Sequence, residues 1–284
     1  MTRVRHFLLA LLSLLPLIAT QMKEDPTAYG IVQQMFAHTK QIESMSYRMK
    51  KTERIDGEML VQKSFAKVTY EPYKAYTRQI SPKEGLEALY IDGKHKNQAL
   101  INTNGFPWIN LRLDPYGKVM RKNQHHTILD AGYRHVVSIL EFLFRKYGEE
   151  TREMASLSES NWDGRACWKV VFNNHHYRED KRVFRQDETV RSWARKQKLS
   201  EYMLLALNSG LDHFEDSMKG ETLTLPNDYC PKMVLVIEKE RMVPLRMEVY
   251  DKKGLYELYE YSDIDLNPDF KDEEFSSDYE EYGF

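Results

Sequence analysis

Two adjacent histidine pairs are the residues of this chain best suited to hold a metal ion. They are His125-His126 and His175-His176. Neighbouring side chains on a strand point to opposite faces, so neither pair can chelate one ion from a regular strand. No cysteine or carboxylate stands beside them at the spacing expected of a zinc site. The sequence therefore predicts no metal ion and no other cofactor.

Local catalytic motifs are missing from the sequence as well. It contains no G-x-S-x-G turn, no phosphate-binding loop and no H-E-x-x-H. A hydrolase would have to be assembled from distant residues. Asn110, Arg112 and Asp114 could contribute to one only if this polar face of their strand pointed into a cavity. We therefore expect a protein that is not an enzyme, with a hydrolase as the weaker alternative.

The two cysteines, Cys167 and Cys230, allow two interpretations. An oxidising compartment would permit a disulfide between them. The alternative is two separate buried thiols, because the sequence does not set the distance between them.

The start of the chain is typical of an exported protein. Arg3 and Arg5 precede an apolar run over residues 7–19. Residues 1–20 therefore predict a signal peptide, cleaved near Ala19 or Thr20. An uncleaved membrane anchor is disfavoured, because the run is short for a bilayer. Loss of the two arginines changes the formal charge from −2 to −4, which argues against nucleic acid as a partner.

The rest of the chain predicts hairpins and two amphipathic helices. One helix should begin at Asp25-Pro26, and a second, capped by Asp130, should end at Gly148. Hairpins are expected at Asp-Gly turns over residues 56–57, 92–93 and 163–164. The expected fold class is α+β, with a curled antiparallel sheet, or incomplete β-barrel, roofed by helices.

Residues 182–228 interrupt the hairpins with a β-α-α-β pattern. This segment resembles the LysM module, a small domain that binds wall glycans. The correspondence runs in order through DETV (187–190), Trp193-Ala194, Leu199-Ser200, LLALN (204–208) and KGETLTLP (219–226). The alternative is an insert kept for packing or protein contact.

The LysM resemblance implies a glycan groove between two loops of the insert. The residues at these positions are Asp187, Glu188, Thr189, Asn208, Ser209 and Gly210. Asp187 stands where the family has glycine, and its side chain would narrow the approach of backbone to sugar.

The surrounding domain, residues 22–181 and 229–284, resembles the LolA-like outer-membrane lipoprotein-carrier superfamily through a related uncharacterised exported family. P-x-K-x-Y is present at Pro72, Lys74 and Tyr76, and E-x-L-Y-x-x-G begins at Glu87. A closing Leu-Asn-Pro follows at residues 266–268. The resemblance implies a half-barrel that binds lipid or acyl chains on its concave face, and a periplasmic location.

Six apolar residues are the candidates for lining such a lipid cavity, and ordinary core is the alternative for each. They are Leu89, Ile91, Leu100, Ile109, Leu111 and Leu113. The leading hypothesis is an exported, non-enzymatic protein that binds a lipid, an acyl chain or a lipidated protein, with peptidoglycan as a second partner of the insert. The alternative is a wall-associated scaffold whose cavity is filled by its own helices. The sequence does not indicate an oligomeric state.

Overall fold

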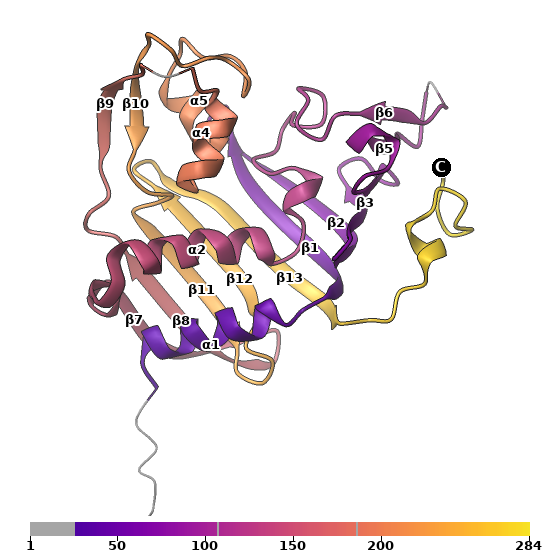
Figure 1. Cartoon of the computed structure of the whole chain (residues 1–284). Helices are drawn as coiled ribbons and strands as arrows, with labels where there is room; N and C mark the ends of the chain where they lie inside the picture. The colour runs from indigo at the N-terminus through magenta and orange to yellow at the C-terminus, as the bar shows by residue number, and fades with distance from the viewer. Residues whose placement is uncertain (1–25, 107, 186) are drawn as a thin grey trace, which may run out of the picture.

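The computed structural model describes residues 26–284 apart from Pro107 and Gln186. The predicted signal peptide at residues 1–20 lies outside this part, as does Asp25. Within the described residues, eleven antiparallel strands form one large open sheet, and two more strands pair separately (Figure 1). The expected α+β class, a curled and incomplete barrel covered by helices, is confirmed.

The large sheet consists of two meanders that meet in its middle. Its spatial order is β6-β5-β4-β3-β2-β1-β13-β12-β11-β8-β7. In chain order the strands are β1 (Ser44–Ile55), β2 (Glu58–Tyr70), β3 (Tyr73–Ser81), β4 (Glu87–Ile91), β5 (Ala99–Asn102), β6 (Leu111–Leu113), β7 (Ala155–Trp162), β8 (Arg165–Asn173), β11 (Lys232–Glu238), β12 (Pro244–Asp251) and β13 (Gly254–Leu266). The pairing of β1 with β13 joins the two meanders.

Turns are present at all three of the expected Asp-Gly pairs. Both residues of Asp56-Gly57 and of Asp163-Gly164 have positive φ, as a two-residue hairpin turn requires. The turn at Asp92-Gly93 follows β4, with a hydrogen bond of 3.1 Å from the Lys94 amide to the Ile91 carbonyl, but a longer loop containing η1 (His95–Asn97) completes the connection to β5. The strand expected over 108–114 is reduced to β6, the short edge strand of the sheet.

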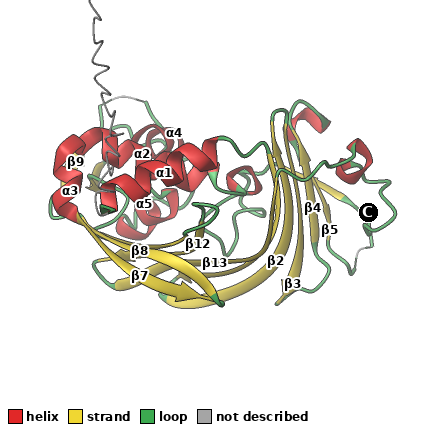
Figure 2. Ribbon diagram, turned by 90° about the horizontal axis from the view of Figure 1, so that it is seen from below, coloured by secondary structure: helices red, strands yellow, loops and turns green. Residues whose placement is uncertain are grey.

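Helices cover one half of the concave face. α1 (Ala28–Lys40) and α2 (Arg134–Tyr147) pack on each other, and α2 is followed by η3 (Gly148–Glu150) and α3 (Thr151–Met154). In Figure 2 these helices gather over β7, β8, β12 and β13, whereas β2 to β5 curl upward beside them. Within the described residues, no helix combines the length and apolarity needed to span a bilayer.

The start of α2 differs from the expectation. Its N-cap is Tyr133 rather than Asp130, which belongs to η2 (Ile128–Asp130) and closes a capping box with Thr127. Gly132 separates η2 from α2 with φ of +80°, and a Cβ there would lie 2.1 Å from the Tyr70 hydroxyl oxygen. Only glycine fits this backbone and this close approach.

The insert is a small unit with its own core. It contains β9 (Glu179–Val183), α4 (Val190–Gln197), α5 (Glu201–Leu207) and β10 (Thr222–Pro226), and β9 pairs with β10. Phe184, Trp193, Leu204 and Met218 belong to an apolar cluster separate from the main core. The β-α-α-β order is therefore as expected, while the identity of the unit as a LysM module stays a prediction.

The C-terminal tail lies on the outer face of the sheet. After β13 the chain forms η4 (Asp272–Phe275), and Phe275 packs with Tyr76, Leu89 and Leu100 of β3 to β5. Figure 1 shows the tail beside these strands, opposite the helical cover. The tail thus protects apolar residues that the strands alone would expose to water.

Candidate functional site

A row of residues across six strands forms the floor of a cavity. The row, one residue from each of β1 to β6 in register, is Tyr47, Ala66, Thr77, Ala88, Ile101 and Leu111. All of them line a cavity of about 500 Å³ on the half of the concave face that the helices leave open. Because Ala66, Thr77 and Ala88 are small, the curled sheet stays hollow at its centre.

The cavity is amphipathic along the strand direction. A second row lies two residues from the first along each strand, toward the β1–β2 turn, and includes Ser64 and Gln79. A third row, two residues further in the same direction, includes Lys51 and Gln62. One end of the cavity is therefore apolar, and the end toward the β1–β2 turn is polar and cationic.

Residues 113–136 form the roof of the cavity. Tyrosine hydroxyls from the floor hold this segment in place. Tyr73 donates a hydrogen bond of 2.7 Å to the Ile128 carbonyl, and the Gly132 amide donates one of 2.8 Å to the Tyr47 hydroxyl. The roof is thus tied directly to the strands beneath it.

The predicted lining residues are only partly correct. Leu111 and Leu113 line the cavity, whereas Leu89 and Leu100 are 3% and 8% exposed on the opposite face, under the tail. Ile91 packs in the same outer cluster. Successive side chains of a strand point to opposite faces of the sheet. Because Ala88 and Ile101 point into the cavity, their neighbours Leu89 and Leu100 point outward, and the prediction assigned them to the wrong face.

The loop before β6 also differs from the expectation. Ile109 is 56% exposed rather than part of a cavity wall. Because Leu111 and Leu113 point inward, Arg112 points to solvent together with Asn110 and Asp114. These three polar residues therefore do not supply a polar constellation in the cavity.

A buried polar network backs the cationic end of the cavity. The Glu257 carboxylate lies 2.8 Å from His125 Nδ1, accepts from Tyr229 at 3.0 Å and lies 3.4 Å from His126 Nε2. His125 Nε2 faces the Arg54 carbonyl at 3.0 Å. Both ring nitrogens of His125 therefore face oxygen atoms, which fixes the orientation of the ring.

The ring of His125 is also held between two aromatic rings. Tyr202 of α5 and Tyr256 of β13 stack on it with centroid distances of 4.6 Å and 4.3 Å. Stacked aromatic contacts of this kind stabilise the ring beyond the burial of its area. His125 therefore joins the roof, the sheet and the insert at one point.

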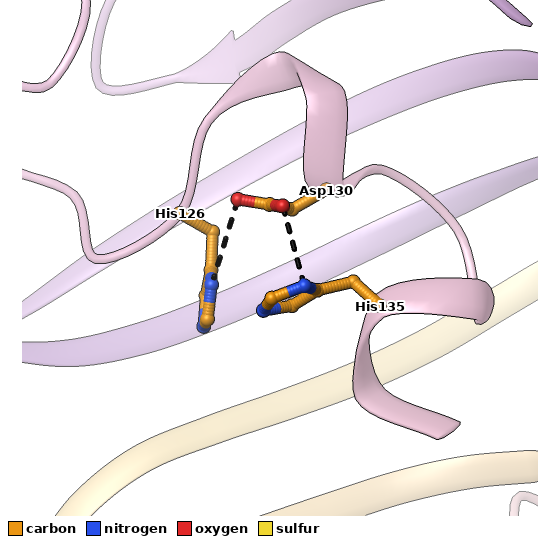
Figure 3. Close-up of side chains that lie close together, drawn as sticks. All are labelled: His126, Asp130 and His135. Atoms are coloured by element: carbon orange, nitrogen blue, oxygen red, sulfur yellow. Dashed lines mark ion pairs between the residues drawn. The ribbon is translucent and has the colours of Figure 1, made fainter. Parts of the chain in front are cut away.

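His126, Asp130 and His135 converge at the cavity wall (Figure 3). His135 Nδ1 lies 3.3 Å from one Asp130 oxygen, and His126 Nδ1 lies 3.9 Å from the other. These three residues could hold a metal ion, since their ligand atoms lie within 4.8 Å of one another. However, Arg195 already binds both Asp130 oxygens, at 2.6 Å and 3.0 Å.

This cluster is the part of the site that sequence reasoning missed. The useful signal was the spacing His126, Asp130, His135 around a turn, not the adjacent pair His125-His126. The glycine turn at Gly132 brings His135 back toward His126, which a strand-based argument does not consider.

The charges in the cluster shift its pKa values in opposite directions. Burial alone would lower the pKa of His126, but Glu257 and Asp130 outweigh it and raise that pKa. Burial lowers the pKa of His135 to about 4, and the attraction of Asp130 opposes this only in part. Burial alone would raise the pKa of Asp130, but His135 and Arg195 hold it well below its usual range.

Stability should depend on His135 between pH 4.5 and 6.5. An unfolded histidine has a pKa near ~6.5, whereas His135 in the folded protein has a pKa of about 4. The unfolded state binds more protons in this range, so stability falls on acidification by up to about 1.4 kcal/mol per pH unit. The raised pKa of His126 acts with the opposite sign and only above pH ~6.5.

Urea unfolding at several pH values tests this prediction. His135→Asn should flatten the pH dependence between 4.5 and 6.5, and exchange of the exposed His38 for Asn should leave it unchanged. An equally steep profile in His135→Asn would contradict the assignment.

The insert is fixed to the roof by ion pairs. Glu201 of α5 pairs with Arg121 and, at 2.6 Å, with Arg195. Arg121 and Glu201 are both buried, so the desolvated pair holds the insert against residues 113–136. The same Arg195 reaches Asp130, which links the insert directly to the cavity wall.

The predicted glycan-binding residues have mostly structural partners. Asn208 is buried, and its side-chain amide forms hydrogen bonds with the backbone of Leu204 and Thr224. Thr189 caps α4. The remaining four residues lie near the surface: Asp187 accepts from Ser217, Glu188 lies 3.5 Å from Lys196, and Ser209 and Gly210 are exposed.

The two cysteines are separate buried thiols. Cys167 of β8 lies opposite Glu238 at the end of β11, whereas Cys230 precedes the start of that strand. Almost the whole length of β11 separates them, so a disulfide is excluded in this fold.

Fold and site define the class: an α+β protein with an open antiparallel half-barrel, a helical cover and an amphipathic cavity on its concave face. The chain belongs to the family described as "Protein of unknown function (DUF1571)", which matches residues 42–193, more than half of the 284 residues. A comparison with curated proteins finds no match.

Several solved structures are similar at low identity. One is a putative outer membrane lipoprotein-sorting protein domain from Vibrio parahaemolyticus, 12% identical, covering 87% of this chain and 94% of that chain, with a TM-score of 0.34. A LolA superfamily protein from Nitrosomonas europaea is 10% identical, with coverage of 89% and 99% and a TM-score of 0.34. Lipoprotein LppX from Mycobacterium tuberculosis is 12% identical, with coverage of 87% and 98% and a TM-score of 0.40.

Proposed function

We propose that this protein is an exported, non-catalytic lipid-binding protein of the periplasm. The cavity takes a lipid, a free acyl chain or the acyl chain of a lipidated protein. The observation that carries the proposal is the row of small residues, Ala66, Thr77 and Ala88, at the floor of the open half-barrel. Burial of an apolar chain there would contribute about 25 cal/mol per Å² removed from water.

The size of the cavity supports this class of ligand. A protein cavity of ~150 Å³ holds one benzene molecule. A volume of about 500 Å³ therefore has room for roughly three times as many carbon atoms, which is about one long acyl chain. The volume also lies within the range of ~300–1,000 Å³ found for small-molecule sites.

The alternative is a wall-associated scaffold whose cavity is filled by its own helices. α1 and α2 cover the other half of the sheet (Figure 2). A cavity remains between the floor strands β1 to β6 and the roof. This arrangement favours a ligand over self-filling. Contact of the insert with peptidoglycan or a protein partner stays part of the proposal, with Ser209 and Gly210 as exposed candidates.

Thr77→Trp should abolish lipid binding. Thr77 lies between Ala66 and Ala88 in the floor, so an indole at this position projects into the hollow and occupies the ligand's space. Native mass spectrometry of the mature protein, before and after incubation with mixed lipids, measures the bound species. The wild type should carry a mass of lipid size that is lost on denaturation, and Thr77→Trp should not.

The matched control is Arg78→Trp, which adds the same side chain on the solvent-exposed face of β3. This variant should bind lipid as the wild type does. Thermal unfolding of both variants excludes misfolding as the cause. A wild type that stays free of lipid, or a Thr77→Trp variant that stays loaded, would refute the proposal.

A further inference from the structure

The carboxylates that line the cavity already have protein partners. Glu53 accepts hydrogen bonds from the Tyr259 hydroxyl at 2.7 Å and from the His125 amide at 3.2 Å. Asp130 is bound on both oxygens by Arg195. Neither carboxylate therefore needs a cationic ligand, and neither offers a strong site for one.

The cationic groups of the cavity are in a different situation. Lys83 and Lys122 line it and are exposed, and within the described residues their ammonium groups form no hydrogen bond or ion pair. His126 also lines the cavity, but Glu257 already lies 3.4 Å from its Nε2. The two lysines thus present positive charge to the cavity without a counter-charge from the described residues, and an anion is the ligand group that would complement it.

These cations lie toward the end of the cavity that is nearest the β1–β2 turn. Lys83 follows the end of β3 on that side, where Ser81 pairs with Lys63 of β2. Lys51 belongs to the polar row of the floor, and it lies opposite Tyr259 of β13. The His126 ring lies 5.8 Å from the Tyr259 ring, at the same level. Lys122 comes from the roof beside Gln124, which bonds Lys51 at 3.2 Å. The apolar row of Ala66, Thr77 and Ala88 lies at the other end.

We propose that the ligand of this cavity is an anionic amphiphile, with its acyl chain over the apolar row and its carboxylate or phosphate head against Lys122 and Lys83. The proposal rests on the lipid-binding function and specifies the head group. Hydrogen bonds between charged partners are about twice as strong as neutral ones, and a partly enclosed site strengthens them further.

Isothermal titration calorimetry with matched ligands tests the head group. Hexadecanoate should bind about tenfold more tightly than hexadecanol, the value expected for one charge-assisted hydrogen bond. Lysophosphatidate should likewise bind more tightly than lysophosphatidylcholine of the same chain length. If hexadecanoate is the tighter of the two anions, the source is a free fatty acid, and if lysophosphatidate is tighter, it is a phospholipid.

Two further outcomes separate this inference from the proposed function. Equal binding of charged and uncharged ligands would overturn the anionic head group and leave lipid binding intact. Failure of all four ligands to bind would overturn both.

Variants of the cationic residues identify the head-group site. Lys83→Gln combined with Lys122→Gln should reduce the preference for hexadecanoate over hexadecanol to about threefold or less, because Coulomb attraction is lost. Both lysines are exposed, so the double variant should fold as the wild type does. Lys118→Gln, an exposed roof lysine that does not line the cavity, should keep the full preference. An unchanged preference in the double variant would contradict the site.

Discussion

Replacement of Glu257 by Ala should lower the free energy of unfolding by about 3–5 kcal/mol, the largest effect of any single side chain in the polar network. Glu257 is 1% exposed and faces His125, Tyr229 and His126 together. Its removal leaves the buried His125 ring and the Tyr229 hydroxyl without their acceptor, and His126 without the carboxylate that faces it. Burial alone would raise the pKa of Glu257, but His126 and His125 outweigh it and keep that pKa low, so the carboxylate is charged at neutral pH. Urea unfolding followed by tryptophan fluorescence measures the loss.

The control for this variant is Asp263→Asn on the same strand. Asp263 pairs with Arg48 at 3.1 Å, and both side chains are exposed. Exposed ion pairs contribute about 0–1 kcal/mol. Equal losses in the two variants would show that the buried network has no special role in stability.

Phe275→Ala should release the C-terminal tail from the sheet. Phe275 is 3% exposed in the outer cluster, and large-to-small changes of this kind cost about 3–5 kcal/mol. Because the tail can detach without unfolding the sheet, the loss appears as local opening. Hydrogen exchange should show it at the Gly283 amide, which donates to buried Glu87 at 2.8 Å. Exchange there should accelerate by about a hundredfold.

Two observations would decide the result for the tail. Glu280→Ala changes an exposed residue of the same segment and should leave Gly283 exchange unchanged. Slow exchange at Gly283 in the Phe275→Ala variant would mean that Tyr282, stacked on Tyr76 at 3.7 Å, holds the tail without help.

Local signals in the sequence predicted much of the framework. The turn at Asp56-Gly57, the end of α2 at Gly148 and the β-α-α-β order of the insert all depend on nearby residues, and each is present. The open, helix-covered antiparallel sheet follows from the same local patterns together with the need to cover one apolar face.

The faces of the strands could not be predicted in the same way. Leu89 and Leu100 are large and apolar, so an inward position was the natural expectation. Their actual cover is Phe275, nearly two hundred residues away in the sequence, which no local pattern connects to β4. The floor of the cavity depends instead on small residues such as Ala66 and Ala88, and small size gives little sequence signal.

The polar network escaped prediction for a related reason. Glu257 is on the last strand of the sheet, His126 on the roof, and Arg195 on the insert. Each of them is an ordinary charged residue in its own segment. Only the fold brings them together behind the cavity, and the balance of charge there determines which of them are protonated.

The junction between β1 and β13 has a consequence for how the protein folds. β1 is the first strand to leave the ribosome and β13 is the last, so one edge of β1 stays unpaired while most of the chain is synthesised. Such an edge can pair with another chain and aggregate, and lysines such as Lys50 and Lys51 of β1 oppose this. Contacts between strands so distant in sequence also slow folding. The two meanders can therefore form independently, but the continuous sheet is completed only after β13 has been synthesised.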